Sequence, residues 1–170
     1  MPLYTVGHSN HSADRLFEII APYSVTVIID VRSVPYSGRF PHFNRDRLAE
    51  AAELHDISYE WWGESLGGIK SSGATLDSIR ESYSFRNAIR KLIERFGNRN
   101  EEETACLLCA EADPRRCHRS MLIGPSFRSA DGGIDLHHIL PDGTLILQSE
   151  LEEKQEAPKV DRAGTMSLFD

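Results

Sequence analysis

Residues 25–31, Val-Thr-Val-Ile-Ile-Asp-Val, form the stretch that most restricts how this chain can fold. The run is rich in β-branched side chains and shows no solvent-facing alternation, which is typical of a strand buried on both faces of a sheet. Both faces become covered when helices connect parallel strands. The run therefore predicts a central parallel strand in an α/β fold.

Strand and helix patterns alternate along the rest of the chain. Apolar residues recur at helical spacing in residues 12–21, 44–55, 84–96 and 114–127. Short apolar runs predict further strands at residues 3–6, 57–61, 104–109, 134–140 and 144–148. Residues 63–82 are rich in Gly and Ser and predict a long loop. This alternation predicts a single Rossmann-like layered α/β domain over residues 1–148, with a mainly parallel sheet flanked by helices.

The length and charge of the chain exclude several classes of protein. A chain of 170 residues suffices for one domain with a substantial core. Its net charge of −7 opposes nucleic-acid binding by bulk attraction, so any such contact must be a local patch. Three cysteines and no leader segment indicate a reducing compartment, and no apolar run is long enough to span a membrane. We expect a cytoplasmic protein.

Residues 149–170 are charged and aperiodic, which predicts a disordered acidic tail with an apolar end. That end, Thr165-Met166-Ser167-Leu168-Phe169, resembles the short peptide by which bacterial repair and replication proteins bind the sliding clamp. Thr165 stands where that peptide usually has Gln. The tail therefore predicts either a contact with the sliding clamp or an apolar end that packs on its own domain or has no partner.

Polar side chains follow three of the predicted strands. The three groups are His8 with Ser9, Asp30 with Arg32 and Ser33, and Cys109 with Glu111. In a parallel sheet these strand ends lie at one edge, where open α/β folds bind ligands. We expect the three groups to converge on one pocket.

Residues 109–120 concentrate thiol, carboxylate, imidazole and guanidinium groups in one segment. Asp113 followed by Pro114 predicts an N-cap and the first residue of a helix. The segment would then lie beside a helix N-terminus, which favours an anion. This mixture marks a site of chemistry more than a part of the core.

A metal site in the same segment would use Cys109, Cys117 and His118. Neighbouring residues of a helix point about 100° apart, and no familiar zinc spacing is present. We therefore predict no metal and no cofactor. For the same geometric reason, we expect Glu111 with Arg119 or His118 to form the working edge and at least one cysteine to be packing.

The motifs of the chain carry a family resemblance. They are Thr5-Val6-Gly7-His8-Ser9, Asp30-Val31-Arg32-Ser33-Val34-Pro35 with Ser37, Leu66-Gly67-Gly68, Leu108-Cys109-Ala110-Glu111 with Cys117-His118-Arg119, and His138-Ile139. Over about residues 3–140 this set resembles the family catalogued as domain of unknown function 488, DUF488. The resemblance implies a site, without naming roles, at His8, Ser9, Asp30, Arg32, Ser33, Cys109, Glu111, Cys117, His118 and Arg119.

The chemistry of the side chains suggests roles. Arginines are suited to phosphate or carboxylate, so we predict that the substrate is bound by Ser9, Arg32, Ser33, Ser37, Arg39 and Arg119. The alternative for Arg32 is a structural ion pair with Asp30 or Glu111. The carboxyl groups of Asp30 and Glu111 predict an acid/base pair, or else helix capping and ion pairing. Two histidines, His8 and His118, can move protons near neutral pH.

The favoured hypothesis is an enzyme that acts on a nucleotide-like or nucleic-acid substrate. It would catalyse hydrolysis or transfer at a glycosidic or phosphate-linked centre, with Asp30, Glu111, His8 and His118 as catalytic residues and an anionic small molecule or nucleic acid as partner. One alternative is a rhodanese-like thiol or sulfur-transfer enzyme that uses Cys109. Another is a non-catalytic nucleotide-binding adaptor.

Overall fold

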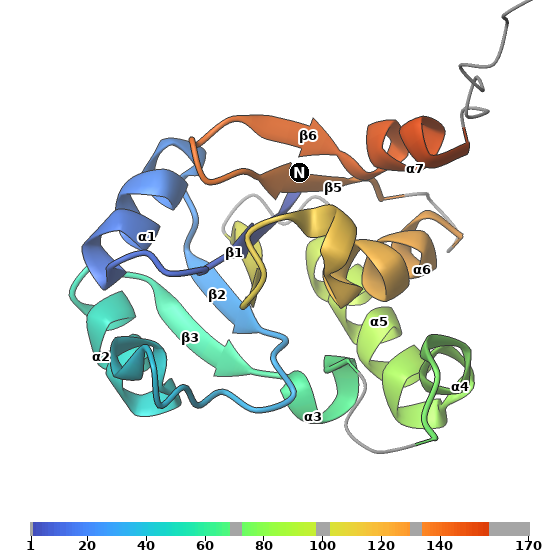
Figure 1. The fold of residues 1–170 in the computed structure, drawn as a ribbon, viewed down its shortest axis with the longest axis horizontal. Coiled ribbons are helices and arrows are strands. Elements are labelled where there is room, and N and C mark those ends of the chain that lie inside the picture. Colours follow the sequence, from blue (N-terminus) through green and yellow to red (C-terminus); the bar gives the residue numbers. More distant parts are fainter. Residues whose placement is uncertain (1, 69–72, 98–102, 130–133, 157–170) are drawn as a thin grey trace, which may run out of the picture.

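Six strands form one sheet in the computed structural model, which describes residues 2–68, 73–97, 103–129 and 134–156 (Figure 1). The strands are β1 (Leu3–Gly7), β2 (Val27–Asp30), β3 (Ser58–Trp61), β4 (Ala105–Cys109), β5 (Leu136–Ile139) and β6 (Leu145–Leu147). Their order is β3-β2-β4-β1-β5-β6, and all neighbours are parallel except β6, which is antiparallel to β5. The predicted mainly parallel α/β sheet is confirmed.

Helices connect the parallel strands and cover both faces of the sheet (Figure 1). The helices α1 (Ala13–Ile20) and α2 (Arg45–Glu53) lie over one face, and α5 (Tyr83–Phe96) and α6 (Gly124–Arg128) lie over the other. Side chains of β4 alternate between the two cores, because Cys106 packs on the α1 and α2 side and Cys109 on the α5 and α6 side.

The segment predicted as a long loop contains two short helices, α3 (Gly63–Leu66) and α4 (Leu76–Glu81). Polar residues that suggested a loop begin α4 instead, since Thr75 and Ser78 exchange the hydrogen bonds of a capping box. The loop prediction was therefore wrong for these parts. Residues 69–72 lie outside the described residues.

The predicted helix over residues 114–127 is broken into pieces. A 3₁₀ turn spans Pro114–Arg116, a π-helical turn spans Arg119–Ile123, and α6 follows. Pro125 has no N–H to donate to the carbonyl of Met121, and Arg80 Nη2 donates to that carbonyl instead at 3.2 Å. The missing donor interrupts the regular helical ladder where the π-helical turn meets α6, whereas the earlier break lies at Cys117, whose backbone is extended.

A further helix, α7 (Gln148–Glu156), occupies the start of the predicted tail. Leu151 is 2% exposed, and Gln148 Nε2 donates to the carbonyl of Ser120 at 2.9 Å. These contacts anchor the helix, so the prediction of disorder from residue 149 was wrong as far as residue 156. Residues 157–170, including the clamp-like peptide, lie outside the described residues. None of the described helices is long and apolar enough to cross a membrane.

Candidate functional site

Two cavities open at the edge of the sheet where β2, β4 and β1 end side by side. The larger has a volume of about 550 Å³, and its lining includes His8, Ser9, Tyr36, Ser37, Arg39 and Asp113. The smaller has a volume of about 260 Å³, and its lining includes Ser33, Gly68, Cys109, Cys117 and His118. Both are lined by Arg32, Val34, Ala110, Glu111 and Arg116, and we call the two together the sheet-edge groove.

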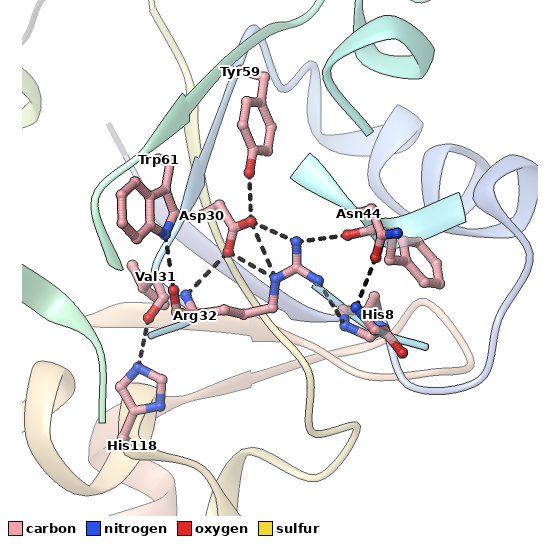
Figure 2. Close-up of polar contacts among 10 residues, drawn as sticks. His8, Asp30, Val31, Arg32, Asn44, Tyr59, Trp61 and His118 are labelled. Atoms are coloured by element: carbon pink, nitrogen blue, oxygen red, sulfur yellow. Dashed lines mark hydrogen bonds and ion pairs between the residues drawn. The ribbon is translucent and has the colours of Figure 1, made fainter. Parts of the chain in front are cut away.

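Asp30 and Arg32 form a buried ion pair behind this groove (Figure 2). Arg32 Nη2 donates to Asp30 Oδ2 at 2.6 Å, and Arg32 Nε donates to both carboxylate oxygens at 2.9 and 3.1 Å. The hydroxyl of Tyr59 donates to Oδ2 at 2.6 Å, and Arg32 Nη2 also reaches the Phe43 carbonyl at 2.9 Å. Asp30 is 0% exposed and Arg32 5%. Asp30 and Arg32 therefore form a structural ion pair, which was the alternative to a substrate-binding role for Arg32, since donors inside the protein hold the carboxylate.

Tyr59 belongs to this cluster and was not predicted as a site residue. Burial and the neighbouring Asp30 raise the pKa of its hydroxyl, which keeps the group protonated as a donor. Strand alternation could have predicted that Tyr59 lies on the same face of the sheet as Asp30. Tyr59 pairs in register with Ile28, and Ile28 and Asp30 are two residues apart in β2 and so share a face. That signal requires knowing that β3 lies beside β2, which the sequence does not state.

His8 lines the larger cavity and contacts Arg32 of the ion pair (Figure 2), and its ring stacks on Phe43 with 4.2 Å between ring centroids. Its Nε2 is 3.2 Å from Arg32 Nη1 and must accept, because a guanidinium only donates. Its Nδ1 then carries the proton and donates to the Ser9 carbonyl at 2.9 Å. Burial and Arg32 lower the pKa of His8 to about 4, so the ring is neutral at pH 7.

The opposite side of β4 carries a second group, which we call the thiol cluster and define as Cys109, Cys117 and His118. Cys117 Sγ donates to Cys109 Sγ at 3.0 Å, and His118 Nδ1 lies 3.6 Å from Cys109 Sγ and 3.8 Å from Cys117 Sγ. His118 Nε2 lies 3.1 Å from the Val31 carbonyl oxygen (Figure 2). A carbonyl only accepts, so Nε2 carries a proton and donates to it, and Nδ1 is the nitrogen that faces the two sulfurs.

This cluster corrects the expectation that Cys117 and His118 point apart as neighbours on a helix. Cys117 is extended, with φ −125° and ψ 143°, between the 3₁₀ turn and the π-helical turn. The break in the helix therefore lets both side chains turn toward Cys109. Cys109 and Cys117 are only 5% and 2% exposed and both belong to the core on the α5 and α6 side, as expected for at least one of them, but the contact between their sulfurs was not predicted.

The two thiols of the cluster differ in acidity. The hydrogen bond from Cys117 lowers the pKa of Cys109, His118 and Arg119 lower it further, and burial opposes them. The hydrogen bond to Cys109 and burial raise the pKa of Cys117. The two pKa shifts have opposite directions because Cys109 accepts the hydrogen bond between the sulfurs and Cys117 donates it. Cys109 is therefore the thiol that ionises first.

Arg119 is fully enclosed beside the thiol cluster. It is 0% exposed, and its Nη2 donates to the Ala112 carbonyl at 2.9 Å. Its Nε and Nη1 have no hydrogen-bond partner among the described residues. Gly7 makes room for it, because a Cβ there would lie 2.7 Å from Arg119 Nη1 and 1.8 Å from the Glu111 carbonyl oxygen. Arg119 is not among the described residues that line the two cavities. It therefore does not face the groove, where a residue that binds the substrate would have to lie.

The other predicted residues lie along the rim. Glu111 is exposed and lines the smaller cavity together with His118. The expected partner of Glu111 at the working edge was either Arg119 or His118. Arg39 is exposed, with its guanidinium 5.3 Å from the Phe40 ring centroid. Ser33, Ser37 and Ser9 line the groove, although Ser33 Oγ also donates to the Gly68 carbonyl at 3.2 Å. Arg116 is exposed and lines both cavities, and it was not among the predicted residues.

The thiol cluster also contains the donor types of a soft-metal site. Its two sulfurs and Nδ1 all lie within 4.8 Å of one another, and zinc sites use thiolate and imidazole ligands. A backbone carbonyl on the far nitrogen of the histidine is a common support for such a ligand. The set therefore admits two kinds of chemistry, a reactive thiol or a bound cation.

Comparison with known proteins adds the family and no activity. A search of curated proteins finds no match. The sequence model of the family described as "Domain of unknown function DUF488" matches residues 12–124, which include α1, β2, β4 and the whole thiol cluster. Since that match covers more than half of the chain, the protein belongs to the DUF488 family.

Proposed function

We propose that this protein is a thiol-dependent sulfur-transfer enzyme in which Cys109 is the nucleophile. The observation that carries the proposal is the contact of Cys109 Sγ with Nδ1 of His118, at 3.6 Å, in the lining of a cavity. A nucleophile beside a base that a third group orients is the usual arrangement in covalent catalysis. Here the Val31 carbonyl orients the base.

The electrostatic surroundings support Cys109 as a thiolate. Cys117 donates a hydrogen bond to it, and the guanidinium of Arg119 is buried nearby with two unpaired nitrogens among the described residues. Both effects stabilise a negative charge on sulfur and lower the pKa of Cys109. Cys106, the third cysteine, is 0% exposed in the opposite core, and burial raises its pKa to about 12.

The groove favours an anionic sulfur donor. Arg116 lines both cavities and Arg39 lines the larger one, and both side chains are exposed. Arginine forks suit the oxyanion groups of thiosulfate. Glu111 also lines both cavities, so we place the oxyanion end of the donor toward the arginines and its outer sulfur toward Cys109.

The geometry favours this mechanism over the carboxylate pair. Acid/base catalysis at a glycosidic centre needs two carboxyl groups that both face the substrate. Asp30 is fully buried, accepts from Arg32 and Tyr59, and is not among the described residues that line the groove. Of that predicted pair, only Glu111 is exposed and lines the groove, and the other carboxylate in the lining, Asp113, is paired with Arg115.

The first step is a displacement at sulfur. The Cys109 thiolate attacks the outer sulfur of thiosulfate and forms a new S–S bond, while the bond inside thiosulfate breaks and sulfite leaves with the electron pair. Cys109 then holds a persulfide. A nucleophilic acceptor, such as cyanide in an assay, takes the outer sulfur and restores the thiolate.

Incubation with thiosulfate tests the proposal. We expect intact-protein mass spectrometry to show a gain of one sulfur atom on Cys109, and thiocyanate to appear when cyanide is added. Cys109→Ser should lose both signals, whereas the matched control Cys106→Ala should keep them. Wild-type protein that never gains sulfur, or a Cys109→Ser variant that still makes thiocyanate, would refute the proposal.

A further inference from the structure

Cys117 stands where a second thiol can act on an intermediate held by Cys109. Its Sγ lies 3.0 Å from Cys109 Sγ, and a disulfide between them needs an approach of about 1 Å. Cys106 cannot take this part, because it packs in the core on the opposite face of the sheet. The fold therefore pairs one particular cysteine with Cys109.

His118 and Arg119 equip this pair for proton and charge transfer. His118 Nδ1 lies 3.8 Å from Cys117 Sγ, so the same nitrogen that faces Cys109 also faces the second thiol. Arg119 is enclosed beside the pair, with Nε and Nη1 unpaired among the described residues. An unpaired buried cation is costly unless negative charge develops next to it, and a sulfur intermediate supplies that charge.

We propose that Cys117 is a resolving thiol that attacks Sγ of the Cys109 persulfide and closes a Cys109–Cys117 disulfide. This inference rests on the proposed function, because it requires the persulfide. The S–S bond of the persulfide breaks, and the outer sulfur leaves with the electron pair. His118 Nδ1 takes the proton of the Cys117 thiol and passes it to that sulfur, which departs as hydrosulfide.

The electrons balance within this step. The outer sulfur gains two electrons, and the two thiols of the protein lose two when their sulfurs join. A dithiol reductant from outside must reduce the disulfide before the next turnover. The protein would therefore release reduced sulfur and would depend on a dithiol partner rather than on cyanide-like acceptors alone.

The test loads the full-length protein with thiosulfate, removes the excess, and follows sulfide release and protein mass without any reductant. Wild type should release sulfide in step with closure of the Cys109–Cys117 disulfide, located by peptide mapping. In Cys117→Ser, the persulfide on Cys109 should persist and sulfide release should be lost. Cys106→Ala, the matched control, should behave as wild type. Cys117→Ala repeats the test should the serine variant melt at a lower temperature.

The outcomes separate the two proposals. A persulfide on Cys109 that survives equally long in wild type and Cys117→Ser would overturn the resolving role and leave the proposed function intact. Absence of any persulfide on Cys109 in both proteins would overturn the proposed function itself. Protein that carries stoichiometric zinc on both thiols, and reacts with thiosulfate only after chelation, would overturn the resolving role in favour of a metal site.

Discussion

Replacement of Asp30 by Asn tests whether the Asp30–Arg32 pair is a structural element of the fold. The carboxylate is 0% exposed and accepts from Arg32 Nε and Nη2, from the Arg32 backbone N–H at 3.0 Å and from the Tyr59 hydroxyl. Asp30→Asn leaves the guanidinium buried without a counter-charge. Breaking a buried pair in this way costs about 3–5 kcal/mol.

That loss is large beside the total stability of a domain, about 5–15 kcal/mol. In urea unfolding followed by circular dichroism, it lowers the midpoint by about 2 M for an m-value of about 2 kcal/mol/M. The control is Glu94→Gln, which breaks the exposed pair with Arg90 and should cost less than about 0.5 kcal/mol. Tyr59→Phe removes one donor to the same carboxylate and should cost about 1.5–3 kcal/mol, which keeps the test open if the first variant does not fold.

A double variant completes the test. Adding Arg32→Met to Asp30→Asn removes the stranded charge, so the two changes together should cost clearly less than the sum of the single changes. Additive costs, or an Asp30→Asn variant that loses less than about 1 kcal/mol, would refute the view that these two residues stabilise the fold as a buried pair.

Three other predictions concern separate parts of the molecule. Burial lowers the pKa of His138 to about 4. As the pH falls, the unfolded chain therefore binds a proton on this residue before the folded protein does. The free energy of unfolding should drop by up to about 3 kcal/mol between about pH 6.5 and pH 4. The same titration on His138→Gln should give a flatter profile, and an unchanged slope would assign the effect to other groups. Gly7→Ala places a Cβ against the Glu111 carbonyl and should destabilise the protein by about 1–3 kcal/mol in thermal melts, whereas an unchanged melting temperature would contradict the close approach. At pH 7, iodoacetamide should label Cys109 before Cys106 in peptide mapping, and added sulfate should slow that labelling; preferential labelling of Cys106 would contradict the assigned acidities.

The sequence predicts the class of fold well because β-branched runs and helical apolar spacing are local patterns. Residues 25–31 have the composition of a strand buried on both faces, and the structure buries all of them except Thr26, with the strand β2 over Val27–Asp30. The breaks were harder to foresee. The extended backbone of Cys117 separates the 3₁₀ turn from the π-helical turn, and the change from that turn to α6 coincides with Pro125, whose missing N–H leaves the Met121 carbonyl to Arg80, a residue far away in the sequence.

The site shows a similar division. Strand ends carrying His8, Asp30 and Cys109 do meet at one edge, as parallel topology requires. Their division into a buried ion pair and a thiol cluster could not be predicted, because it depends on which face of the sheet each side chain takes. Asp30 shares a face with Tyr59 and Phe43, whereas Cys109 shares the other with His118.

The two clusters are joined by a single peptide unit at the end of β2. The carbonyl of Val31 holds His118, and the next residue, Arg32, holds Asp30 and His8 and lines the groove. The Val31 carbonyl and the Arg32 N–H belong to the same rigid peptide plane, and that N–H donates to Asp30 Oδ1 at 3.0 Å. The buried ion pair therefore also fixes the direction of the carbonyl that holds the His118 imidazole, so a change that loosens the Asp30–Arg32 pair should loosen the support of His118 as well.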